Sequence, residues 1–306
     1  MALQQSEVRA LIARHKFRDM LLDVVGLVVM LTMMLILAAL FLQLVMDGGD
    51  RLTADFFQNF PSRRAAKAGI LAAWVGSLLV MLVTALAAVP VGVAAGIWLE
   101  EYAPKSWFSE IIEINVNNLA GVPSIIYGLL GLGLMVHQLQ LGRSVASAGL
   151  TLAMMILPVV IVATREAIRA VPQTIREAAY GLGATRWQVT RDHVLPYSVA
   201  GIMTGVIIGL SRAIGETAPL ITIGAVTFIA FLPAPPVQAS APFLNFEWLT
   251  SPFTVMPIQM FNWISRPDAA FHVNAAAAGV VLVGMTLLMN GVAILLRYRA
   301  RKRIKW

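Results

Sequence analysis

The sequence predicts an all-α integral membrane protein with six transmembrane helices. Hydrophobic residues make up 58% of the 306 residues and charged residues only 13%, whereas about a quarter of an ordinary soluble domain is charged. Apolar runs of about 20 residues, long enough to cross a bilayer as helices, recur along the chain. Lys and Arg gather at both termini and in one internal loop. The composition therefore excludes a soluble globular enzyme and a disordered chain.

A membrane domain is predicted between residues 21 and 297, with short polar tails on either side. The expected spans lie near residues 24–46, 70–97, 116–136, 145–164, 197–220 and 273–296. The apolar stretch 194–232 is too long for one span at about 1.5 Å per residue, so a re-entrant or irregular segment should follow the fifth span. Proline and glycine in the second and third spans are expected to kink these helices and to allow close packing.

The distribution of basic residues predicts that both termini are cytoplasmic. Lys and Arg are frequent in the amino tail (1–20), in the loop 165–196 and in the carboxyl tail (298–306), as is typical of the inner side of a membrane. A seventh span would place the basic carboxyl tail outside, which this tendency disfavours. The basic cluster from Arg63 to Lys67 is an exception, because it falls on the outer side.

Two further segments complete the predicted topology. The first apolar run is longer than the apolar region of a secretory signal, so it should be retained as a membrane anchor. The segment 233–272 is rich in proline and aromatic residues. It is expected to be a periplasmic loop at the membrane interface, where aromatic rings are favoured.

The cytoplasmic loop 165–196 is predicted to form two short helices joined by a turn. Thr174 to Glu177 and Thr185 to Gln188 both have the form of a capping box, which marks the start of a helix. Gly183 should end the first helix in a left-handed conformation. Leu195-Pro196 is expected to end the second helix.

Three functions fit this helical loop. A DNA-binding helix-turn-helix agrees with its outline and arginines, but such a domain needs its own core, and both ends here are tethered to spans. A solvated amphipathic loop is the plainest alternative. The membrane flanks favour a third function, in which the small residues Ala178, Ala179 and Gly183 let a partner protein approach closely.

The fifth predicted span carries an intramembrane charge pair. Gly201, Gly205 and Gly209 recur every four residues, a spacing that marks a face packed against another helix. Arg212 and Glu216 follow on this face, and such residues within a span usually line a polar pathway. The planar guanidinium suits an oxyanion such as phosphate, and a nearby carboxylate would temper the attraction. Arg212 and Glu216 are therefore the candidate pathway residues, with a purely structural ion pair as the alternative.

These segments resemble those of known transporters. Glu177-Ala178-Ala179, Gly183 and the later Leu195-Pro196 match the EAA signature of permease subunits of bacterial ABC importers, although His193 stands where isoleucine is usual. The segment from Ser211 to Leu220 closely resembles phosphate-specific ABC permeases of the PstA type. Residues 121–128 and 256–261 agree with the same family. Some of its members carry an arginine near the end of the fourth span, where this chain has Val162, with Arg165 one turn later.

The resemblance implies the architecture and partners of a type I, MetI-like ABC importer permease in a bacterial inner membrane. The implied partners are a second homologous permease subunit, two copies of a cytoplasmic ATPase, and a periplasmic or lipid-anchored phosphate-binding protein. The ATPase would dock on Glu177, Ala178, Ala179 and Gly183. The chain has no ATP-binding P-loop motif, so it is not expected to be an enzyme or to bind a cofactor, and its partner would use ATP. No metal or nucleic acid is expected.

Three alternatives to a phosphate permease stay open on the sequence. The first is a permease for another oxyanion, such as sulfate, molybdate or phosphonate. The second is an intramembrane enzyme that uses Glu216 as a general acid or base, while Arg212 binds an anionic lipid headgroup. The third is a purely structural subunit, in which apolar residues could replace both without loss of transport.

Overall fold

The computed structural model describes residues 5–238 and 243–302, so the outermost residues of both predicted tails and residues 239–242 of the predicted outer loop lie outside it. Regular structure in the described residues is helical, apart from an isolated β-bridge between Val237 and Leu244. In chain order the helices are α1 (Gln5–Gly48), η1 (Gly49–Arg51), α2 (Ala54–Gln58), η2 (Ala65–Lys67), α3 (Leu71–Ile97), the π-helix η3 (Trp98–Tyr102), α4 (Trp107–Leu119), α5 (Ser124–Gly131), the π-helix η4 (Leu132–Gln138), α6 (Val145–Arg169), α7 (Gln173–Gly181), α8 (Arg186–Gln188), the π-helix η5 (Val189–Val194), α9 (Leu195–Ile214), α10 (Ala218–Ile223), η6 (Glu247–Leu249), α11 (Met256–Ile264) and α12 (Ala269–Lys302).

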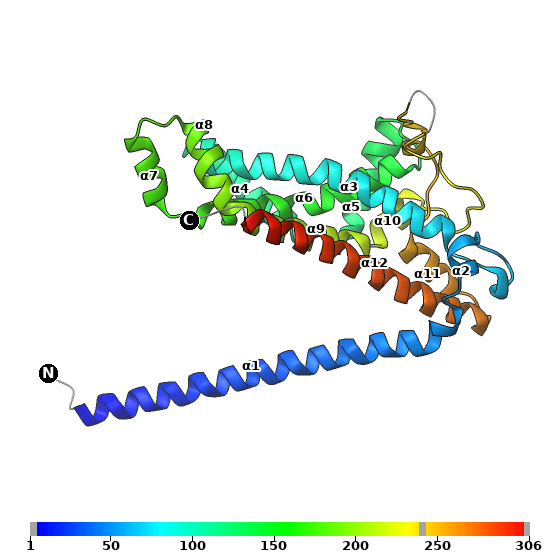
Figure 1. The fold of residues 1–306 in the computed structure, drawn as a ribbon, viewed down its shortest axis with the longest axis horizontal. Coiled ribbons are helices and arrows are strands. Elements are labelled where there is room, and N and C mark those ends of the chain that lie inside the picture. The colour runs from blue at the N-terminus through cyan, green and yellow to red at the C-terminus, as the bar shows by residue number, and fades with distance from the viewer. Residues whose placement is uncertain (1–4, 239–242, 303–306) are drawn as a thin grey trace.

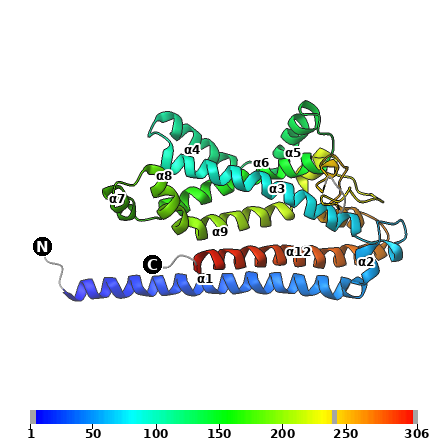
Figure 2. The ribbon, with the colours of Figure 1, turned by 45° about the horizontal axis from the view of Figure 1, so that its top comes forward.

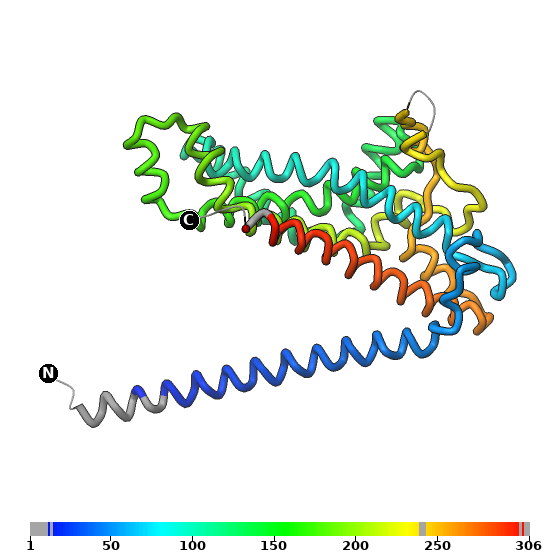
Figure 3. The backbone as a smooth tube through the Cα atoms, viewed as in Figure 1, coloured from blue at the N-terminus to red at the C-terminus, as the bar shows by residue number. Residues whose placement is uncertain are grey.

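Long apolar helices run back and forth along the molecule (Figures 1 and 2). Within the described residues, 5 continuous helical segments are long and apolar enough to cross a membrane, and a bent pair makes up to 6 crossings. Following the chain along the tube, α1 begins and α12 ends at the end of the molecule that carries α7 (Figure 3). The predicted all-α fold with six membrane crossings is confirmed.

The third crossing is a bent pair of helices where one continuous span was expected. Helix α4 ends at Leu119 and α5 begins at Ser124, with an angle of 106° between the two halves. Pro123 has no N–H to donate, and it disfavours the helical conformation for Val122 before it. The Gly-Val-Pro sequence therefore breaks the helix completely, where a kink was expected.

The fifth crossing begins and ends differently from the prediction. Helix α9 ends at Ile214, Gly215 follows as its cap, and the short helix α10 starts only at Ala218. At the other end, Leu195-Pro196 does not terminate a helix, because α8, η5 and α9 form one continuous segment. Pro196 lies in the first turn of α9, and the π turn η5 directly before it lets the helical segment continue through the proline.

Helix α6 lies at the centre of the bundle, and its neighbours reach it through glycine. A Cβ added to Gly96 of α3 would lie 2.7 Å from Thr164 Cβ, and one added to Gly201 of α9 would lie 2.6 Å from Ala167 Cβ. At Gly205 the added atom would overlap Ala163 in the same way. The predicted packing of the glycine face of α9 is confirmed. In lipid, where apolar burial drives association weakly, such close van der Waals contact holds helices together.

Helix α1 leaves the bundle along most of its length (Figure 1). Every side chain from His15 to Leu40 is exposed, although this part of the helix is strongly apolar. Its carboxyl-terminal end packs on α12, where Gly48 approaches the backbone of Ala277. Just beyond it, Arg51 Nε donates to Asn274 Oδ1 of α12 at 2.9 Å. A helix that is apolar on all sides needs lipid or another protein around it.

The predicted outer loop folds partly back into the protein. Helix α11 is tied to α3 by the Met256 amide, which donates to Ser77 Oγ at 2.9 Å. The aromatic residues singled out in the predicted outer loop divide into two groups. Trp248, Phe253 and Trp263 are buried, whereas Phe243, Phe246 and Phe261 are exposed. Only the exposed group is therefore free to meet a membrane interface.

The contact of Gly205 with Ala163 provides a test of the close packing of α9 on α6. Changing Gly205→Ala should destabilise the protein by about 1–3 kcal/mol, because the added methyl group has no room. This should lower the thermal unfolding temperature of the detergent-purified protein. The matched variant Gly291→Ala, on α12 with nothing within 4 Å, should leave it unchanged or slightly raised. Equal stability of the two variants would contradict the packing role of Gly205.

Candidate functional site

The candidate pathway residues Arg212 and Glu216 lie together where α9 ends. Arg212 is in the last turn of α9, whereas Glu216 lies beyond its end, in the link to α10. Arg212 Nε donates to Glu216 Oε1 at 3.4 Å. The two were expected on one helix, but the break at Gly215 still leaves them in contact. Their side chains are 41% and 19% exposed, so the pair lies at the protein surface of this single chain.

Arg212 lies near the middle of the membrane-spanning length. Gly209, one turn before it, faces Ile156 and Val160, and these residues flank the midpoint of α6, which runs from Val145 to Arg169. A charged side chain at this depth costs several kcal/mol unless it meets a polar cavity or partner. A broken helix at the same depth is likewise tolerated where it borders a cavity or other protein.

The Arg212 guanidinium keeps most of its hydrogen-bonding capacity. Within the described residues, its hydrogen bond is the one from Nε to Glu216, and its terminal amino groups donate none. Its neighbour Ser211 is held by α12, since Ser211 Oγ lies 2.6 Å from Asn290 Oδ1. The end of α9 is therefore held by α12, while the terminal amino groups of Arg212 have no hydrogen-bond partner among the described residues.

The break between α4 and α5 packs beside the break between α9 and α10. A Cβ added to Gly128 would lie 2.6 Å from Pro219 Cα and would overlap Thr222 Oγ1. The Tyr127 hydroxyl donates to the carbonyl of Leu119, at the end of α4, at 2.8 Å. The structure therefore brings together the segments 121–128 and 211–220, which lie far apart in the sequence.

The predicted docking residues lie on α7 and the turn after it. Glu177, Ala178 and Gly183 are exposed. Ala179 is only 5% exposed, and it packs in a small apolar cluster with Ile168, Val171, Val189 and Val194. Ala179 thus supports α7 from beneath, and its exposed neighbours form the outer surface.

The ends of these short helices match the sequence only in part. The capping box of Thr185 and Gln188 and the left-handed conformation of Gly183, with φ at 84°, are confirmed. The Ala184 amide donates to Ala179 and the Gly183 amide to Tyr180, the two bonds of a Schellman motif. The box predicted at Thr174 does not form, because the N-cap of α7 is Pro172, two residues earlier, and Thr174 lies inside the helix.

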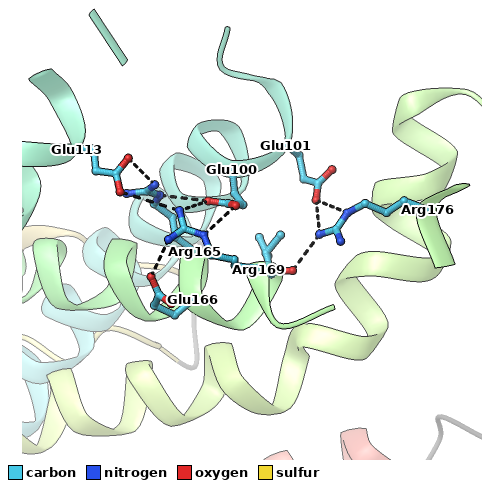
Figure 4. Close-up of polar contacts among 8 residues, drawn as sticks. Glu100, Glu101, Glu113, Arg165, Glu166, Arg169 and Arg176 are labelled. Carbon is cyan, nitrogen blue, oxygen red and sulfur yellow. Dashed lines mark hydrogen bonds and ion pairs between the residues drawn. The ribbon is translucent and has the colours of Figure 1, made fainter. Parts of the chain in front are cut away.

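The arginines at the end of α6 belong to a charge cluster that sequence reasoning missed (Figure 4). Arg165 pairs with Glu113 of α4 at 2.8 Å and with Glu100 of η3 at 3.5 Å. Arg169 donates to both carboxylate oxygens of Glu100, at 3.0 and 3.2 Å. The cluster joins η3 at the end of α3, the middle of α4 and the end of α6.

Arg176 of α7 extends this cluster to the docking element. Its terminal amino group lies 2.9 Å from Glu101 Oε1; the Glu101 side chain is buried at 7% exposure, and that of Arg176 is nearly so at 11%. Arg176 also donates to the carbonyls of Ile168 and Val171, at 2.9 and 2.6 Å, and so caps the end of α6 (Figure 4). Removing one partner of such a buried pair typically costs about 3–5 kcal/mol, because the other charge is left unpaired.

Arg165, the other arginine that the sequence brought up for the pathway, does not lie beside Arg212 and is paired with Glu113 and Glu100 instead. Helices α6 and α9 are antiparallel, so Arg165 is level with a residue about nine positions before Arg212, or roughly 13 Å away along the axis. The sequence held one signal for this charge cluster, since Glu100 and Glu101, the partners of Arg165 and Arg176, directly follow an apolar run. Leu182, beside the docking residues, is 91% exposed, and no feature of the sequence predicted this exposure.

A metal site is not formed by the described residues. They contain no group of three or more His, Cys, Asp or Glu side chains placed to hold an ion. The charged groups that the described site does present are the Arg212 guanidinium and the Glu216 carboxylate beside it.

Comparison with known proteins places these features in a family. Residues 88–306 match the family described as binding-protein-dependent transport system inner membrane component. The probable ABC transporter permease protein YqgI of Bacillus subtilis is 30% identical, with 85% of this chain and 84% of that protein covered. The phosphate transport system permease protein PstA is 32% identical in Yersinia pestis, covering 78% and 75%, and 37% identical in Mycobacterium leprae, covering 77% and 72%.

A solved structure shares the fold. It is a chain of the MetNI methionine ABC transporter in an inward-facing conformation, with a TM-score of 0.57, 16% identity, and coverage of 74% of this chain and 93% of that one. The predicted MetI-like architecture is confirmed. The chain belongs to the family of binding-protein-dependent transport system inner membrane components, and it is a multi-pass permease subunit of an ABC transporter.

Proposed function

We propose that this chain is the permease subunit of an ATP-driven importer of inorganic phosphate and forms half of the translocation pathway. The observation that carries the proposal is the Arg212 fork, which lies near mid-membrane with unused donors. A phosphate ion presents oxygens in the geometry that a guanidinium binds through two parallel hydrogen bonds. The relatives named phosphate transport system permease proteins support phosphate as the oxyanion.

The second half of the pathway comes from a homologous permease subunit. In the single chain, Arg212 is 41% exposed at the surface, and a charge at this depth needs more protein or water around it. The exposed apolar length of α1 offers a further surface for that subunit or for lipid. A heterodimer would enclose the pair of Arg212 and Glu216 between its two halves.

Energy comes from partners on the cytoplasmic side. Two copies of an ABC ATPase dock on the permease pair, one on each permease subunit. In this chain the ATPase contacts the exposed residues Glu177, Ala178 and Gly183, and the buried Ala179 supports them from beneath. The chain binds no ATP itself, since it lacks the P-loop motif. The orientation is that of a bacterial inner-membrane protein with both termini cytoplasmic, and a periplasmic or lipid-anchored binding protein delivers phosphate from outside. ATP-driven closure of the ATPases would expose Arg212 to the two sides in turn.

Replacing the pathway arginine tests the proposal directly. Arg212→Gln should lower phosphate uptake at subsaturating concentration at least about tenfold, because each lost charge-assisted hydrogen bond contributes about 1.5–3 kcal/mol. The measurement is ATP-dependent uptake of labelled phosphate into proteoliposomes that hold the complete transporter. Arg63→Gln, which removes an exposed charge elsewhere, should transport normally. Normal uptake by Arg212→Gln in an assembled transporter would make the pair structural.

The carboxylate beside Arg212 should set the preference among oxyanions. Glu216 can accept a hydrogen bond from the P–OH group of hydrogen phosphate, which fully ionised sulfate does not offer. Glu216→Gln should therefore reduce the preference for phosphate over sulfate in competition uptake assays, whereas Glu247→Gln, in the outer loop, should not. An unchanged preference in Glu216→Gln would refute this role, and preferred uptake of sulfate, molybdate or phosphonate by the wild type would refute phosphate as the substrate.

A further inference from the structure

The π-helix η3 connects the inner end of α3 to several elements at once. Glu100 is paired with the two arginines of α6, and the next residue, Glu101, is paired with Arg176 of α7. The third residue, Tyr102, places its hydroxyl 3.4 Å from Thr190 Oγ1 of η5. Because successive residues of a helical turn point in different directions, one turn reaches both the membrane helices and the docking loop.

Arg176 is the polar link between α7 and the rest of the protein. Two nitrogens of its guanidinium donate to Glu101 Oε1. Its amino groups also donate to the carbonyls of Ile168, in the last turn of α6, and of Val171, just beyond it. A cavity of about 590 Å³, lined by residues of η3, α7 and the α6 end, lies beside the pair. Apolar packing supports α7 through Ala179, and its opposite surface, including Glu177 and Ala178, is exposed.

We infer that the buried pair of Glu101 and Arg176 transmits displacement of α7 to the membrane helices. This inference rests on the proposed function, in which an ATPase docks on the exposed surface of α7. A push on α7 moves Arg176, which moves Glu101 and with it the end of α3. The adjacent Glu100 then carries the movement to Arg165 and Arg169 of α6 (Figure 4). Arg176 and Glu101 are positioning residues, since neither touches the transported ion.

The test separates coupling from a purely structural role by measuring two rates on the same sample. Glu101→Gln and Arg176→Gln transporters are reconstituted with their ATPase and binding protein, and ATP hydrolysis and phosphate uptake are recorded together. Hydrolysis should persist, while phosphate taken up per ATP should fall about tenfold, within the range typical of coupling between sites. Arg191→Gln is the matched control, because it removes an exposed ion pair with Asp192 in the same loop and should change neither rate.

A single substitution leaves one charge unpaired and could prevent the transporter from assembling, so a double variant that removes both charges is also measured. The double variant Glu101→Gln with Arg176→Gln leaves no buried ion alone and should assemble, hydrolyse ATP and transport poorly. Normal phosphate uptake per ATP in the variants that assemble would overturn the inference. Failure of the double variant to assemble would overturn it too, because the pair would then be a structural anchor.

A readout that needs no substrate keeps this inference separate from the phosphate proposal. The chain has no cysteine, so Ile125→Cys, at the exposed start of α5, gives a single labelling site in it. The partner subunits are made cysteine-free. ATP should then change the rate at which the introduced cysteine reacts with a membrane-impermeant maleimide, and Glu101→Gln should abolish that change. If ATP changes the labelling rate but the transporter takes up no phosphate, only the proposal that phosphate is the substrate is contradicted. If the ATP-dependent change survives Glu101→Gln, only the inference about Glu101 and Arg176 is contradicted.

Discussion

Helix α6 positions the other helices, because small residues remove the side chains that would hold the backbones apart. Gly96 of α3 and Gly201 and Gly205 of α9 face it from two sides. In a bilayer the lipid is as apolar as a leucine side chain, so this close contact, and not apolar burial, holds the bundle together. The depth of Arg212 and the position of the α6 arginines both follow from the register that these contacts impose.

Two broken crossings use this rigid support. The chain leaves the helical path at Pro123 and again at Gly215, and the segments after the breaks, α5 and α10, pack together through Gly128. Backbone at a break loses its helical bonds, and in a membrane it must find other partners. The Tyr127 hydroxyl supplies one of them to the carbonyl of Leu119. Arg212 and Glu216 lie at this junction, where irregular backbone and charge occur at the same depth.

At the end of the bundle that carries α7, ion pairs connect the helices, whereas close glycine contacts connect them along the spans. The arginines at the end of α6 are neutralised by Glu100 and Glu113, and Arg176 by Glu101. The pair of Arg176 and Glu101 is the most buried of these, and breaking a buried pair is costly because the remaining charge is left unpaired. Arg212 has a single carboxylate partner, through Nε alone, and keeps its remaining donors. This contrast separates the arginines of the charge cluster from Arg212, for which we propose a role in anion binding.

The sequence alone determined the helical class, the crossings, the glycine face of α9 and the two caps at Gly183 and Thr185, because each depends on local spacing and backbone chemistry. It also identified Arg212 and Glu216 as candidate pathway residues, since charges are rare in apolar runs. Tertiary structure decided the complete break before Pro123, the burial of Ala179 and the pairing of Glu101 with Arg176. These depend on which elements meet in space, and residues 75 positions apart carry no local signal that they will form one ion pair.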